Sequence, residues 1–187
     1  MATKLTLFVS PDYVKQATPM GRTVDDDVLA PAILNAQERH ILPTLGTDLY
    51  NRVKKDIEND QLAGTYATLN NDYIIPCLVQ YAFSEVIPHL RSVVAHNSVT
   101  TASGEQASPA SESDVRQLIH RADSLGAFHK ERMMDWLCSR TDLPEYTSNV
   151  YPDLNPTRRN YSQGLNLDPN YESQTYAIAK QLLGLKT

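Results

Sequence analysis

Apolar residues recur every three or four positions over most of the chain before Pro144, which is the spacing of one face of an α-helix. After Asp25 this pattern predicts a first core helix with the apolar residues Val28, Leu29, Ala32, Ile33, Ala36 and Ile41. Pro43 and Gly46 are expected to end it, and Thr47 to cap a second helix. The second stripe comprises Leu49, Tyr50, Val53 and Ile57. The short connection predicts that the two helices are neighbours.

The most apolar stretch predicts a central core helix. Its apolar residues are Ile74, Ile75, Leu78, Val79, Ala82, Phe83, Val86, Ile87, Leu90, Val93 and Val94. Pro88 is expected to kink this helix or split it near Glu85, because proline lacks the amide that continues the hydrogen bonding. A further long helix is expected after a capping box formed by Ser111 and Asp114. Gly126 within that helix predicts a bend or a close helix crossing.

Three segments lack a helical period. Residues 5–9 suit either a short strand or an extended lead-in. Residues 96–113 are polar, and they predict an excursion from the helices, such as a small β-hairpin turning near Gly104. Residues 145–171 are rich in Pro and Tyr, which favours an extended arm that docks on a surface over a solvated linker. A short final helix is expected over residues 176–185, with Tyr176, Ile178, Leu182 and Leu185 near one another.

These patterns together predict a mainly α protein, a helical bundle of about four core helices. The expected organisation is an N-terminal lead-in over residues 1–24, a helical core over 25–145 with the excursion at 96–113, and a C-terminal arm over 146–187.

Composition narrows the functional classes. The 187 residues include 17 basic and 22 acidic side chains, and the net charge of -5 argues against a general polyanion binder. No apolar run is long enough for a signal peptide or a membrane span, so no membrane association is expected. Cys77 and Cys138 form no CxxC pair, which predicts buried thiols made in a reducing cytoplasm.

No catalytic motif is recognisable, so we expect a protein that is not an enzyme and that needs no cofactor or metal. Three successive aspartates, Asp25, Asp26 and Asp27, would suit a metal-dependent hydrolase, but carboxylates at a helix start more commonly cap free amides. His120 with Asp123 and His129 with Glu131 are the nearest further ligand pairs, and neither has a matched partner in the sequence. Cys138 suits a nucleophile only if a histidine approaches it.

One stretch resembles a known family. Residues 8–15 read Phe-Val-Ser-Pro-Asp-Tyr-Val-Lys, and the likeness continues through Thr18-Pro19, Val24-Asp25, residues 29–33, Ala36-Gln37 and residues 41–50, Ile-Leu-Pro-Thr-Leu-Gly-Thr-Asp-Leu-Tyr. These packing and turn residues resemble the helical head-tail connector proteins of tailed bacteriophages, above all the neck proteins of crAss-like phages. The later helices agree with that family in order.

This resemblance implies a structural virion protein made in the host cytoplasm and placed at the head-tail neck. It implies a ring of about twelve copies that contacts the portal protein and further neck or tail proteins. DNA would pass through the lumen without sequence-specific binding. Within this scheme the partner-binding candidates are Val99, Thr101, Tyr146, Tyr151, Arg158, Arg159, Tyr161 and Tyr171.

Two alternatives stay open at this point. The adjacent pair Arg158 and Arg159 suits an acidic or phosphate-bearing partner surface and equally a solvated surface. The whole chain also suits a small cytoplasmic helical adaptor or assembly chaperone that forms no ring.

Overall fold

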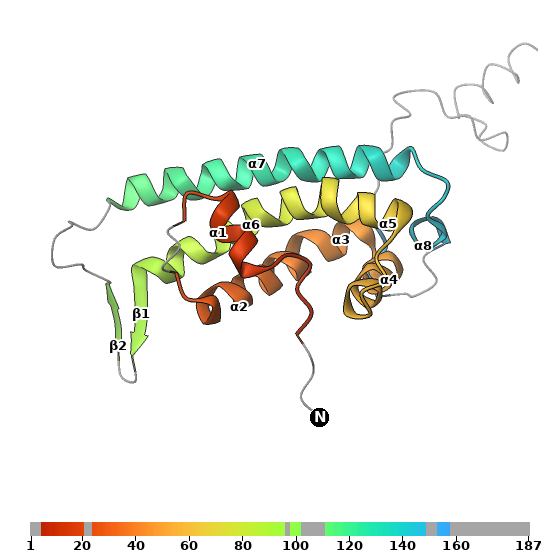
Figure 1. Cartoon of the computed structure of the whole chain (residues 1–187). Coiled ribbons are helices and arrows are strands. Elements are labelled where there is room, and N and C mark those ends of the chain that lie inside the picture. The colour runs from red at the N-terminus through yellow and green to blue at the C-terminus, as the bar shows by residue number, and fades with distance from the viewer. Residues whose placement is uncertain (1–4, 21–23, 96–97, 102–110, 149–152, 158–187) are drawn as a thin grey trace, which may run out of the picture.

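A computed structural model of the chain describes residues 5–20, 24–95, 98–101, 111–148 and 153–157. The protein is mainly helical, as predicted (Figure 1). In chain order its elements are α1 (Pro11–Ala17), α2 (Asp26–Ala36), the π-helical turn η1 (Gln37–Ile41), α3 (Leu42–Leu45), α4 (Thr47–Glu58), α5 (Gly64–Thr68), the π-helical turn η2 (Leu69–Ile74), α6 (Ile75–Arg91), β1 (Ser92–Ala95), β2 (Ser98–Thr101), α7 (Glu112–Cys138) and α8 (Pro144–Ser148).

The apolar face of α6 forms the centre of the core. The long helix α7 packs along one side of α6 and α2 along another, while α4, α5 and α8 gather at the end of the bundle opposite the strands (Figure 1). The largest fully buried side chains are Leu29, Ile33, Gln37, Ile41, Leu45, Leu49, Leu69, Ile74, Leu78, Met133, Leu137 and Leu143. One continuous cluster of buried residues therefore joins most of the described helices.

Side-chain caps begin α1, α2 and α7. The Asp25 carboxylate accepts from the Asp27 amide at 3.3 Å, and Asp26 forms an ion pair with Lys15. Ser111 Oγ accepts from the Asp114 amide at 3.2 Å, and Ser10 Oγ caps α1 in the same way. The capping interpretation of the aspartates is confirmed, and the described residues contain no group of three side chains that could hold a metal ion.

The predicted first core helix continues further than Pro43. Pro43 lies in the first turn of α3, directly after the π-helical turn η1, and α2, η1 and α3 follow one another without a break. Gly46 ends the run with φ +77°, a conformation that favours glycine. The prediction that Thr47 caps α4 is wrong, since its hydroxyl instead accepts from the Leu154 amide at 3.0 Å.

The N-terminal segment is part of the core rather than a separate lead-in. Gln37 is fully buried in η1, and its Oε1 accepts from the Phe8 amide at 2.8 Å while its Nε2 donates to the Thr6 carbonyl at 3.2 Å. Phe8 stacks on Tyr50 with ring centroids 5.0 Å apart. The predicted boundary at residue 24 therefore does not divide two units, because a buried amide pairs with the segment before it.

Helix α6 runs unbroken from Ile75 to Arg91 with Pro88 inside it, so the predicted split near Glu85 is wrong. The predicted close crossing at Gly126 is confirmed. A Cβ atom at this position would lie 2.9 Å from Cε1 of Tyr81, which is closer than carbon atoms approach one another. Glycine at 126 therefore lets α7 approach α6 closely.

A β-hairpin interrupts the helices, but earlier than predicted. Strands β1 and β2 pair antiparallel, with Ser92 opposite Thr101 and Ala95 opposite Ser98, so only residues 96–97 separate them. The turn is therefore not near Gly104. Val93 and Val94, which extended the predicted helix, belong to β1, because β-branched residues suit a strand as well as a buried helix face.

The C-terminal arm begins later than residue 146. Tyr146 lies in α8, belongs to the core cluster and keeps only 4% of its surface exposed. Further along, the Thr157 amide donates to the Pro43 carbonyl at 2.9 Å, and Leu154 pairs with Thr47. Residues 153–157, here called the strap, therefore pack on their own chain. The predicted final helix over residues 176–185 lies outside the described residues.

Helix by helix, nothing in the described part of the chain combines the length and the apolar character that crossing a membrane requires.

Candidate functional site

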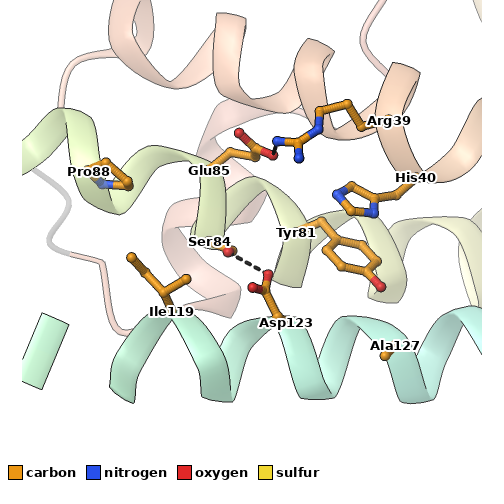
Figure 2. A pocket seen from close by; sticks show the side chains of 9 residues that line it. All are labelled: Arg39, His40, Tyr81, Ser84, Glu85, Pro88, Ile119, Asp123 and Ala127. Carbon is orange, nitrogen blue, oxygen red and sulfur yellow. Dashed lines mark hydrogen bonds and ion pairs between the residues drawn. The ribbon is translucent and has the colours of Figure 1, made fainter. Parts of the chain in front are cut away.

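A cavity of about 510 Å³ opens between η1, α6 and α7 (Figure 2). Its polar side chains come from all three elements, so the packing of α7 on α6 creates it. It is lined by Arg39, His40, Tyr81, Ser84, Glu85, Pro88, Ile119, Asp123 and Ala127.

The polar groups of this cavity bind one another across the helix interfaces. Ser84 Oγ donates to Asp123 Oδ1 at 2.6 Å, which links α6 to α7. Arg39 forms an ion pair with Glu85, which links η1 to α6. Both contacts are visible in Figure 2. The cavity wall is therefore held by cross-helix contacts as well as by apolar packing.

His40 and Tyr81 form a flat aromatic pair in the same cavity. Their ring centroids are 3.6 Å apart and their planes differ by 3°. Burial, together with the nearby positive charges of Lys130 and Arg39, lowers the pKa of His40 to about 4. Burial also raises the pKa of Tyr81 to about 12. Both rings are therefore neutral at pH 7.

The hydroxyl of Ser84 pairs with a carboxylate in this cavity, since Ser84 Oγ donates to Asp123 Oδ1. His40 lies against Tyr81, away from the Ser84 hydroxyl (Figure 2). What the cavity offers a ligand is a neutral imidazole, two carboxylates and one guanidinium.

Another hollow in the described part of the molecule is an apolar groove of about 310 Å³ between α1, α6 and α7. Three apolar side chains of α7 remain exposed along it and just beyond it: Leu118 at 40%, Leu125 at 43% and Phe128 at 60%. These residues follow one another at helical spacing, so they form a single stripe. The full lining consists of Ala17, Pro19, Gln80, Phe83, Leu118, Arg121, Ala122 and Leu125.

The structure places the predicted partner-binding residues in three different settings. Val99 and Thr101 belong to β2 of the hairpin. Tyr146 lies in α8 and is buried in the chain's own core, so it presents almost no surface to a partner. The remaining candidates, Tyr151, Arg158, Arg159, Tyr161 and Tyr171, lie outside the described residues.

No pattern in the sequence brings together the side chains that line the two hollows. Asp123 stands out in the sequence only as one half of the pair with His120, and Ser84 does not stand out at all. Their contact joins positions that are 39 residues apart. Only the spacing of Leu118 and Leu125, seven residues apart on one helix, was a local signal for the groove.

The chain matches one family model, described as a family of unknown function (DUF6712), over residues 41–155. The chain belongs to the DUF6712 family. No curated protein and no solved structure gives a significant match. The DUF6712 region begins at the end of η1 and ends within the strap, so it contains α3 to α8 and the hairpin. It therefore includes most residues of both hollows, while Arg39, His40 and α1 precede it.

Proposed function

We propose that this protein is a structural component of the head-tail neck of a tailed bacteriophage, where copies of it form a ring beneath the portal protein. The observation that carries the proposal is the β-hairpin, which leaves the helical bundle at one end between the two longest helices (Figure 1). The likeness of residues 8–50 to head-tail connectors supports the same role.

The bundle has the properties of a rigid building block. Its core is continuous from Phe8 to Tyr146, and α6 and α7 approach closely at Gly126. Close-packed interiors deform little, so a ring made of such units transmits force between capsid and tail. The strap adds contacts that hold residues 153–157 to the same body.

The hairpin offers a means of joining one copy to another. Among the described residues its sheet has only two strands, so each strand has one outer edge. An outer edge carries backbone amides and carbonyls that can pair with a strand of another chain. In a ring, the hairpin would reach the adjacent subunit or the portal, and Val99 and Thr101 of β2 would lie in that contact.

The net charge of -5 is consistent with a conduit for DNA. A strongly basic lumen would bind the phosphate backbone and slow the passage of DNA, whereas an acidic subunit would not.

The test is to mix the full chain with purified portal rings of its own virus and to count subunits per complex by negative-stain electron microscopy. A symmetric collar on one face of the portal is the expected result. The hairpin variant Val99→Asp/Thr101→Asp should form no collar, while the matched surface variant Val28→Asp should form one. Absence of a collar, together with absence of the protein from purified virions, would overturn the proposal and favour a cytoplasmic adaptor or chaperone.

A further inference from the structure

The apolar groove between α1, α6 and α7 leaves part of its surface exposed to solvent. Leu118 and Leu125 are exposed at 40% and 43%, while Ala122 between them is buried at 3%. Phe83 of α6, which is buried, also lines the groove, together with Ala17 at the end of α1 and Pro19 just after it. Arg121 is the one charged residue of this lining in the described chain. A surface of this kind binds an apolar helix face.

The C-terminal sequence contains a segment with the matching pattern. Ile178, Leu182 and Leu185 stand at positions i, i+4 and i+7. Leu118, Ala122 and Leu125 of α7 have the same spacing. Side-chain rows of this spacing on two helices can interdigitate over two turns. Lys180 falls on the opposite side of such a helix, and residues 176–187 contain no acidic side chain.

The connecting chain is long enough for the segment to reach the groove of its own molecule. The last described residue is Thr157, whose amide donates a hydrogen bond to the Pro43 carbonyl. Residues 158–175 span at most roughly 60 Å when extended. Helix α7, which runs most of the length of the bundle, is about 40 Å long by its helical rise. A tethered segment is also present at an effective concentration far above that of a second copy.

We propose that residues 176–185 form a helix that packs into the groove between α1, α6 and α7 of the same chain, with Ile178, Leu182 and Leu185 against Leu118, Ala122 and Leu125. The occupant is therefore the chain's own C-terminal segment. This inference is independent of the head-tail role, because it requires neither a ring nor a portal.

Disulfide trapping in the full chain tests this arrangement. The variant Cys138→Ser/Leu125→Cys/Leu182→Cys places one thiol in the groove and one on the segment. The matched control, Cys138→Ser/Val28→Cys/Leu182→Cys, moves the first thiol to an exposed position at the start of α2. Cys77 remains in both variants, because burial raises the pKa of its thiol to about 12 and makes it unreactive.

The expected result under mild oxidation is an intramolecular disulfide between residues 125 and 182, formed at least tenfold faster than the 28–182 disulfide. Covalent dimers through residues 125 and 182 would assign the groove to a second copy and overturn the proposal. Equal rates in the two variants, or no disulfide in either, would overturn it as well.

Two further substitutions separate docking from folding. Leu118→Glu alters the groove at a side chain that is already 40% exposed, and Leu185→Glu alters the segment. Each should slow the 125–182 disulfide at least tenfold while the helical circular dichroism spectrum stays unchanged. An unchanged rate with either substitution would overturn the proposal.

Discussion

The ring of Tyr81 occupies the space in which a side chain at residue 126 would stand. A Cβ atom at Gly126 would lie 2.9 Å from two carbons of this ring. The same ring stacks on the imidazole ring of His40 in the cavity. Tyr81 of α6 thus sets the distance between α6 and α7. It also forms the aromatic contact between α6 and η1, through His40.

Gly126→Ala is expected to destabilise the protein, although alanine is the better helix former. The added methyl group must displace the Tyr81 ring, and overpacking of this kind costs about 1–3 kcal/mol. Urea unfolding should show this loss, and Ser124→Ala, at an exposed position of the same helix, should not. In a Tyr81→Leu background the penalty of Gly126→Ala should fall below about 0.5 kcal/mol. An equal penalty in both backgrounds would contradict this account.

Gln37→Leu is expected to release the N-terminal segment from the bundle. The substitution keeps the volume of the side chain but leaves the Phe8 amide and the Thr6 carbonyl without their buried partner. Unsatisfied buried groups of this kind cost about 2–4 kcal/mol together. Hydrogen exchange at the Phe8 amide should accelerate. The free energy of unfolding measured with urea should fall by about 2–4 kcal/mol. Gln117→Leu, on the exposed side of α7, is the matched control and should change stability little.

Gly46→Ala should loosen the strap. Gly46 has φ +77°, and a Cβ atom there would lie 2.7 Å from Cδ of Pro156. Gly64 provides a matched control, because it has φ +57° but no heavy atom within 4 Å of an added Cβ. Both substitutions carry a backbone penalty of about 1 kcal/mol. Any further loss of stability in Gly46→Ala therefore measures the contact of residue 46 with the strap. Limited proteolysis should then cut near residue 154 faster in Gly46→Ala alone.

Stability should fall as the pH is lowered from about 6.5 to about 4 through the titration of His40. The folded state holds the pKa of this imidazole at about 4, below its usual value of 6.5, so the unfolded state binds more protons in that interval. Stability contributed by the neutral ring is present above pH 6.5 and is lost as the pH falls toward 4. After solvent screening of this partly buried ring we expect a loss of about 1–2 kcal/mol.

The variant His40→Gln isolates this contribution. Its stability should depend less on pH than that of the wild type between pH 6.5 and 4, measured by urea unfolding at a series of pH values. Burial also lowers the pKa of His129, so both proteins should retain some dependence. Identical pH profiles for the two proteins would exclude His40 as the cause.

The sequence by itself determined the helical class, most helix faces and several helix ends. Periodicity and capping are local properties, so the stripe from Leu29 to Ile41 and the cap at Ser111 could be predicted from neighbouring residues alone. Glycine within a long helix also indicated the crossing at residue 126, since glycine is costly there unless close approach requires it.

Only the tertiary structure decided which residues leave these local patterns. Val93 and Val94 continue an apolar helical stripe, but they pair with Val99 and Thr100 in the hairpin. Tyr146 suited a docking arm but belongs to α8 and is buried in the core, while Thr47 suited a cap and instead binds Leu154 across 107 positions. The cavity around Ser84 and Asp123 arises in the same way. Packing between segments that are far apart in the sequence determines these contacts. The pattern of apolar and polar residues along the chain does not show which segments pack together.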